Sequence, residues 1–178
     1  KLPSKMSTSP DSIPSIFLKQ TAHTITVPLT LIFRQIMLQG CIPNIWKTAI
    51  VTPIHKKDSK TNVQNYRPIS LTCITCRILE RLVHRRLCHF LERGQILSPK
   101  QHGFQNRRST LSAMLNFSND CMNTLQNNRS LFACYFDFQK AYDSVSHSKL
   151  LAKLANFGIG GSLYKFFTSF LLDRTFVV

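Results

Sequence analysis

Acidic side chains are scarce in this sequence, which has 8 Asp and Glu residues against 23 Lys and Arg residues and a formal net charge of +15. Solubility alone does not require a charge this far from zero. The excess is concentrated, because residues 44–108 hold thirteen Lys and Arg residues against Asp58, Glu80 and Glu92, which is 13 − 3 = +10. This clustering argues against a uniformly solvated coat and predicts a footprint for a polyanion.

The sequence also lacks long apolar runs, a secretory leader and a regular cysteine pattern. Its apolar runs are far shorter than a membrane span, and their interior charges exclude one. Six cysteines at irregular spacing imply no disulfide framework and favour a reducing compartment. We therefore expect an intracellular protein with no membrane partner.

A zinc site is an alternative use of some cysteines. Cys73 and Cys76 form one CxxC pair, and His84, Cys88 and His89 follow it. No second CxxC or HxxxH pair completes a tetrahedral set, and the apolar spacing around this pair favours the buried start of a helix over zinc.

Hydrophobic periodicity predicts a mixture of helices and strands. A first helix, capped by Asp11 or Ser12, is expected to stop at Pro28. The other helices are expected over residues 29–39 (ending at Gly40), 76–93, from Ser109 or Thr110 to about 126, and from Ser148 to just before Gly158. The glycines of "GIGG" are expected to form a hinge into residues 162–173. Strands are predicted at 46–57 and 66–72 as a basic hairpin, at 131–138, and from 175 onward.

The strand predicted over 131–138 carries an unusual carboxylate. Alternation places Phe132, Cys134, Phe136 and Phe138 on one face and Asp137 on the other, at the carboxyl end. Asp137 is either a solvated or capping residue, or a ligand for a divalent metal. A metal held by a carboxylate beside a substrate held by Lys and Arg is the layout of phosphoryl or nucleotidyl transfer.

Several segments resemble one known family. "NYRPISLT", "QHGFQNRRST" and "FDFQKAYDSVSH" occur in the order found in the reverse transcriptase domain of non-LTR (LINE-type) retrotransposons. The resemblance extends to "SPDSIPSIFLK", "GCIPNIWKTAIVTPIHKK" and the stretch from 150 to 178, so that it covers nearly the whole chain after about residue 8. It implies an RNA-directed DNA polymerase that uses Mg²⁺, an RNA template, a DNA primer and dNTPs, in nuclear and cytoplasmic ribonucleoprotein.

The resemblance assigns roles around the incoming nucleotide. Asp137 matches the first metal-binding carboxylate of the palm, and the backbone carbonyl of Phe138 also contacts metal in this family. Tyr142 matches the aromatic steric gate beneath the sugar, with an ordinary core tyrosine as the alternative. Lys56 and Arg67 match the two cations of the fingers that hold the triphosphate.

Other positions are assigned less directly. Lys57 and Lys60 are interpreted as plain surface charge, and His55 stands where the family often has proline, which puts the hairpin backbone in question. Asp143 is expected to organise the turn into the next helix rather than to bind metal, and Asp173 to be an exposed turn residue.

In "QHGFQNRRST" the resemblance implies template contact, in which Gly103 permits close approach, Phe104 anchors the loop, and Arg107 and Arg108 reach phosphate.

The implied fold is α+β, a partial right-hand polymerase truncated before the catalytic ADD hairpin. The expected domains are an N-terminal helical extension (1–45), fingers (46–128) and a partial palm (129–178). Two-metal chemistry needs several carboxylates, because one Asp cannot hold two Mg²⁺ ions and a triphosphate. After Asp143 the sequence contains a single further acid, Asp173. We therefore expect the 178 residues alone to bind RNA without synthesis, and a degenerate, inactive RNA-binding fragment is the alternative function.

Overall fold

The computed structural model describes residues 9–178, which form two compact units. The first runs up to Leu82 and resumes at Ser146–Val178, and the second is Val83–Val145. Residues 1–8 of the expected N-terminal extension lie outside the described residues. The three domains named from the sequence stay a prediction, because compactness alone does not define fingers and palm.

The first helices differ from the sequence prediction at two points. Asp11 does not cap a helix; it accepts hydrogen bonds from Ser9 Oγ (2.5 Å) and the Ile13 N–H (3.2 Å), and α1 (Ser15–Gln20) begins only after Pro14. The break then falls at Thr21, and α2 (Ala22–Gln39) continues through Pro28. Proline removes one hydrogen bond of α2, but α2 also contacts α1 and α7 (Gly161–Leu171), and this packing stabilises the helix.

Gly40 ends α2, as predicted. Its backbone is left-handed (φ 67°, ψ 26°), and its N–H donates to the Ile36 carbonyl at 2.8 Å. A Cβ atom placed on Gly40 would lie 2.4 Å from Lys165 Cβ and 2.8 Å from the Ser162 carbonyl oxygen. Glycine is therefore required here both by the turn and by the close approach of α2 to α7.

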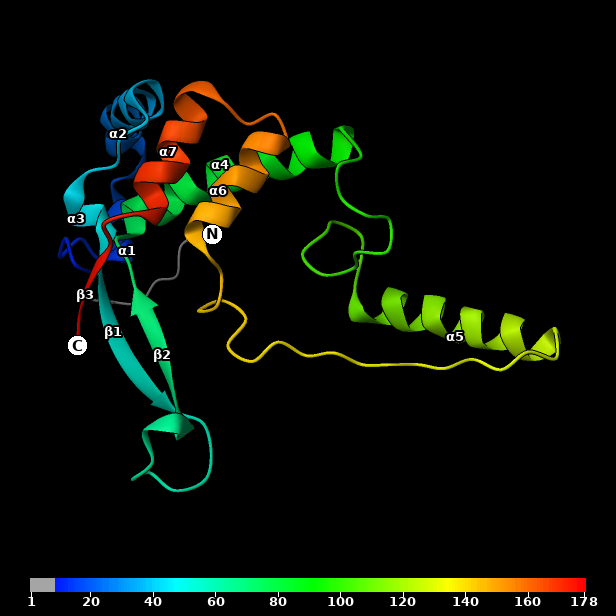
Figure 1. The fold of residues 1–178 in the computed structure, drawn as a ribbon. Coiled ribbons are helices and arrows are strands. Elements are labelled where there is room, and N and C mark those ends of the chain that lie inside the picture. Colours follow the sequence, from blue (N-terminus) through cyan, green and yellow to red (C-terminus); the bar gives the residue numbers. More distant parts are fainter. Residues whose placement is uncertain (1–8) are drawn as a thin grey trace. The chain divides into compact units, whose positions relative to one another are not determined.

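The predicted hairpin is confirmed and belongs to a sheet of order β2–β1–β3 (Figure 1). Strand β1 (Thr48–His55) pairs antiparallel with β2 (Tyr66–Leu71), and β3 (Thr175–Val177) pairs parallel with the start of β1. The loop between β1 and β2 contains a short 3-10 helix, η1 (Val63–Asn65). Pro53 lies opposite Pro68, so neither residue is required to donate an N–H to the other.

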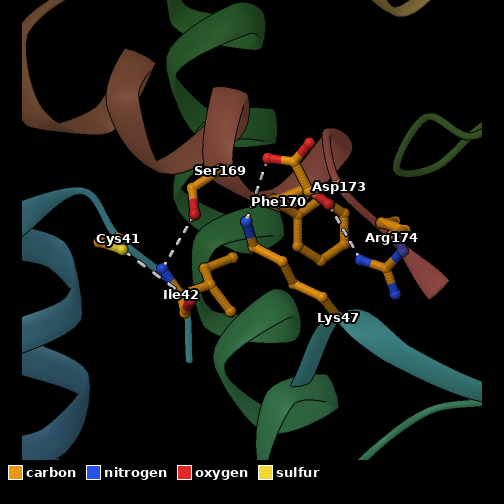
Figure 2. Close-up of polar contacts among 7 residues, drawn as sticks. All are labelled: Cys41, Ile42, Lys47, Ser169, Phe170, Asp173 and Arg174. Carbon is orange, nitrogen blue, oxygen red and sulfur yellow. Dashed lines mark hydrogen bonds and ion pairs between the residues drawn. The ribbon is translucent and has the colours of Figure 1, made fainter. Parts of the chain in front are cut away.

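Polar contacts fasten the end of α7 to the chain before β1 (Figure 2). The Ile42 N–H donates to Ser169 Oγ at 3.0 Å. At the end of α7 itself, the guanidinium of Arg174 donates to the Phe170 carbonyl at 2.9 Å. Asp173, the expected turn residue, has φ 54° and faces Lys47 at 4.0 Å from an exposed position. The Lys47 side chain is only 12% exposed, whereas that of Asp173 is 90% exposed, so the pair joins a largely buried ammonium to a carboxylate in solvent. The guanidinium of Arg174 also lies 5.0 Å from the centre of the Phe170 ring, at the start of β3.

All the buried hydrophobic residues described belong to the first unit. Helix α3 (Asn44–Lys47) supplies Trp46, whose ring lies edge-on to Phe33 of α2 at 6.1 Å. The start of α4 (Ile74–Arg93) and α6 (His147–Asn156) pack into the same core. Its most enclosed members are Leu18, Ile36, Ile42, Cys73, Ile74, Cys76, Leu79, Ile159 and Phe166.

The second unit has helical structure without a buried core. Ser109 caps α5 (Thr110–Gln126), as predicted, and exchanges hydrogen bonds with Ser112 in a capping box. The apolar side of α5 is exposed, with Leu111 at 66% and Met114 at 63%. This helix therefore depends on its cap and its own hydrogen bonds rather than on burial.

The predicted strand over residues 131–138 is wrong. The segment contains no strand and no strand pairing (Figure 1), and Phe132, Phe136 and Phe138 are 97%, 88% and 80% exposed instead of buried. Tyr135 makes its one described ring contact, edge-on to Phe117 of α5 at 6.2 Å. Within the described residues no neighbouring strand offers its backbone, and an extended segment without a partner does not form stable β structure.

Candidate nucleotide and nucleic-acid interface

Lys56 and Arg67 lie on one face of the β1–β2 hairpin. Arg67 is directly opposite Ile54, and the Lys56 N–H donates to the Asn65 carbonyl at 2.8 Å, which continues the same register. Opposite residues share a face, as do residues two apart on one strand. The two cations are therefore diagonal neighbours, both are exposed, and neither has an acidic partner in the described part of the chain.

The other face of the hairpin carries His55 and Tyr66. Their rings lie edge-on with centroids 5.3 Å apart, and the His55 ring nitrogen Nε2 is 3.0 Å from the Asp58 carbonyl oxygen. Tyr66 Oη donates to the Lys60 carbonyl at 2.9 Å, so the same pair also holds the connecting loop. Histidine in place of the family's proline leaves the ladder regular, and Lys56 and Arg67 keep their shared face.

The residues matched to the palm lie in the exposed segment that follows α5. Asp137, Phe138 and Tyr142 are all exposed, Tyr142 at 82%. Tyr142 is thus not a core tyrosine. The turn over 139–144 is closed by the Ser144 N–H, which donates to the Lys140 carbonyl at 3.1 Å, whereas Asp143 makes no described hydrogen bond. The expectation that the Asp143 side chain organises this turn is wrong, because backbone and Ser144 contacts do so.

The donors present suit a magnesium ion in kind but not in number. A carboxylate from Asp137 and a carbonyl from Phe138 are hard oxygen ligands of the type that Mg²⁺ prefers. Between residues 9 and 178 the structure contains no group of three or more His, Cys, Asp or Glu side chains able to hold a metal. These residues could supply one side of a metal site, and further carboxylates would have to complete it.

The segment matched to template contact forms a braced loop between α4 and α5. The Arg108 guanidinium donates to the carbonyls of Pro99 and Gln101, the second at 3.2 Å. Arg107 is exposed in a left-handed conformation (φ 59°). A Cβ on Gly103 would meet nothing within 4 Å, so its surface is open. Phe104 does not anchor the loop, because its ring is 89% exposed; Arg108 has that role instead.

Helix α4 adds a row of four arginines and one histidine. The same spacing of four residues, about 6 Å of helix rise, separates the exposed residues Arg77, Arg81, Arg85, His89 and Arg93. Residues four apart lie on one side of a helix. A row of this kind suits a phosphate backbone better than a single anion.

The cysteines of the CxxC pair are buried hydrogen-bond donors. The Cys73 thiol donates to the Ile45 carbonyl at 3.3 Å and the Cys76 thiol to Glu80 at 3.3 Å. Burial, reinforced by the Asp11 carboxylate, raises the pKa of Cys73 to about 11, and burial beside Glu80 raises the pKa of Cys76 further. Zinc binds the thiolate, so these environments disfavour the zinc alternative.

No helix within residues 9–178 meets the length and hydropathy that crossing a membrane requires.

Comparison with known proteins agrees with the resemblance seen in the motifs. Residues 54–177 match the family described as reverse transcriptase (RNA-dependent DNA polymerase). This stretch includes Lys56, Arg67, the braced loop and Asp137.

Curated relatives are similar over most or all of the chain. A probable RNA-directed DNA polymerase from transposon BS of Drosophila melanogaster is 29% identical over 178 residues, and the RNA-directed DNA polymerase from mobile element jockey of the same species is 30% identical over 179. They cover 99% and 100% of this chain. A retrovirus-related Pol polyprotein from type-1 retrotransposable element R2 of Popillia japonica is 30% identical and covers 78%. The chain spans about a fifth of the length of these relatives, 19–20%.

Proposed function

The chain belongs to the reverse transcriptase (RNA-dependent DNA polymerase) family, and on that premise we propose that it is part of an enzyme that copies RNA into DNA for a non-LTR retrotransposon. In this proposal the chain is the fingers and the first part of the palm of a right-hand polymerase. The partners are an RNA template, a DNA primer and dNTPs, with Mg²⁺ as cofactor. The remaining metal ligands and the ADD hairpin belong to other parts of the longer enzyme.

The observation that carries this proposal is the shared face of Lys56 and Arg67. Triphosphate recognition needs positive charge from more than one direction, and a flexible ammonium next to a planar guanidinium provides it. Bound Mg²⁺ would neutralise charge on the phosphates and polarise them. In this chain, Asp137 and the Phe138 carbonyl would hold such an ion, and Tyr142 would limit space at the sugar.

Triphosphate binding tests the cation pair directly. We expect Lys56→Gln and Arg67→Gln each to weaken binding of a dNTP to the 178-residue chain about tenfold, measured by calorimetry at low salt. Each substitution removes a charge-assisted contact, and a tenfold loss corresponds to about 1.4 kcal/mol, which is near the low end for such contacts because both side chains are exposed. The double variant should lose less than the sum, because both cations hold the same phosphates.

Lys60→Gln is the matched control, because Lys60 lies, like Lys56, in the segment that connects β1 to β2 and is interpreted as surface charge. It should leave dNTP binding within about twofold of the parent chain. Equal losses for Lys60→Gln and Lys56→Gln would mean that only net charge matters, and the proposed role of the pair would be rejected.

RNA binding by the chain alone should be strong at low salt and fall steeply as salt is added. With about six phosphate contacts, the logarithm of the binding constant should fall with a slope of about −4 against the logarithm of salt concentration. Fluorescence anisotropy of a labelled single strand measures this slope, and a primer-extension assay on the same sample should detect no synthesis. A binding constant unchanged between 50 and 200 mM salt would contradict the electrostatic basis of the proposal.

A further inference from the structure

Thr110 begins α5 with a hydroxyl group that no described contact uses. The sequence indicated Ser109 and Thr110 as alternative caps, and in the structure the cap is Ser109, whose Oγ accepts a hydrogen bond from the Ser112 N–H at 3.3 Å. Thr110 is exposed, and its side chain makes no described hydrogen bond within residues 9–178. Its hydroxyl can therefore react without loss of the cap.

The residues around Thr110 form a pattern of charge and hydrophobicity. Arg107 and Arg108 stand three and two residues before it, and Leu111, which is 66% exposed, follows it. Protein kinases select substrates partly by such charge patterns, and carboxylates bind guanidinium groups through charge-assisted, often bidentate hydrogen bonds. The pattern suits a kinase that reads two arginines before the acceptor and an apolar residue after it.

The local structure allows a kinase to reach this segment. Residues 101–109 contain no helix or strand, and the backbone of Ser109 is extended (φ −152°, ψ 171°). Helix α5 has no buried residues, so opening its first turn breaks backbone hydrogen bonds without exposing a core. Arg108 would exchange the neutral carbonyls of Pro99 and Gln101 for a carboxylate, which binds a guanidinium more strongly.

Ser59 provides an internal comparison, because two lysines precede it at the same two positions. Its hydroxyl is engaged: Ser59 Oγ lies 2.7 Å from Thr61 Oγ1 and accepts a hydrogen bond from the Thr61 N–H at 3.3 Å. A third lysine follows Ser59 in place of an apolar residue, and lysine cannot form the planar bidentate contact of arginine. These differences favour Thr110 over Ser59 as an acceptor.

We propose that Thr110 is phosphorylated by an arginine-directed protein kinase and that the phosphate weakens RNA binding by the braced loop. Thr110 Oγ1 attacks the γ-phosphorus of Mg²⁺-ATP, the bond to the β,γ-bridging oxygen breaks, ADP leaves, and the hydroxyl proton passes to the catalytic aspartate of the kinase. The new group carries about −1.5 to −2 charges at pH 7. The modification is independent of the proposed function, whereas its effect on RNA rests on that function.

A phosphate at Thr110 acts on the helix and on the loop. The first turn of α5 has backbone N–H groups without intrahelical partners, and a helix N-terminus stabilises negative charge. Arg107 and Arg108 are the cations expected to reach the template, and a phosphate two or three residues away competes with RNA for them. Phosphorylation should therefore raise the helicity of α5 while it lowers RNA affinity, a combination that unfolding does not produce.

Incubating the 178-residue chain with an arginine-directed kinase and Mg²⁺-ATP tests the site, and mass spectrometry of peptides locates the phosphate. We expect Thr110 to carry most of it, Thr110→Ser to remain a substrate, and Thr110→Val to lose the modification. Arg107→Gln should slow phosphorylation about tenfold, because one charge-assisted contact is lost. Ser118→Ala, at an exposed position of α5, is the matched control and should change nothing. No incorporation, or incorporation mainly at Ser59, overturns the site.

Fluorescence anisotropy of a single-stranded RNA measures the consequence for binding. The phosphorylated chain should bind about tenfold more weakly than the unmodified chain at low salt, with a smaller difference as salt is added, because the lost contacts are electrostatic. Kinase treatment should leave the RNA affinity of Thr110→Val within about twofold. Equal RNA affinity of the two forms overturns the regulatory effect. A parent chain that binds no RNA overturns the proposed function and with it this effect, whereas phosphate transfer to Thr110 is decided by the mass spectra alone.

Discussion

Replacing Gly40 by alanine is expected to lower the free energy of unfolding of this chain by about 2–5 kcal/mol. Two costs add at this position. A left-handed backbone costs a residue with a Cβ roughly 1–2 kcal/mol, and the new Cβ would lie 2.4 Å from Lys165 Cβ and 2.8 Å from the Ser162 carbonyl. Relief requires α2 and α7 to separate, and overpacking of this kind costs about 1–3 kcal/mol.

Urea denaturation followed by circular dichroism measures this loss, and Gly158→Ala provides a matched control. Gly158 is also left-handed, with φ 86°, but a Cβ there would meet nothing within 4 Å. Only the backbone cost of about 1–2 kcal/mol applies to it. If the two variants lose the same stability, then the close approach of α7 to Gly40 contributes nothing, and the helix pair is not packed as described.

The elements that the sequence predicted well are those determined by neighbouring residues. The hairpin was visible in two β-branched runs separated by a polar loop, and α5 in a Ser109 cap followed by helical spacing. Gly40 was the expected end of α2. Each of these signals acts over a few residues, so no knowledge of tertiary contacts was needed to find them.

The wrong predictions concern features that depend on distant partners. Proline at position 28 normally stops a helix, but packing of α2 against α1 and α7 carries the helix through it. Residues 131–138 alternate like a strand, yet a strand also needs a neighbour to receive its backbone hydrogen bonds. Alternation reports only which side chains could share a face, not whether a second strand is present.

In the candidate site, too, residues placed by local structure could be predicted, whereas residues whose environment depends on distant contacts could not. Register along the hairpin places Lys56 and Arg67 on one face, which strand periodicity makes predictable once the pairing is known. The exposed position of Phe104 could not be predicted, since an aromatic residue beside glycine is as compatible with an exposed loop as with a buried one.

In the complete polymerase that we propose, Asp137→Asn should reduce DNA synthesis by about 10³-fold or more while RNA affinity is retained. The amide has nearly the same shape but no negative charge, so it binds Mg²⁺ poorly, and a 10³-fold loss corresponds to about 4 kcal/mol of transition-state stabilisation. RNA affinity should stay equal or rise slightly, because one charge that repels phosphate is removed. Primer extension at saturating dNTP and filter binding of the same preparation measure the two effects separately.

Asp143→Asn is the matched control for this experiment, because it makes the same chemical change six residues away in the same exposed segment. It should keep synthesis within about tenfold of the parent enzyme, since Asp143 makes no described hydrogen bond and is not assigned to the metal. Near-normal synthesis by Asp137→Asn would remove the metal role of that residue. A parent enzyme that binds RNA but incorporates no dNTP with Mg²⁺ would instead favour the degenerate RNA-binding fragment, because binding by the basic surfaces does not depend on the carboxylate.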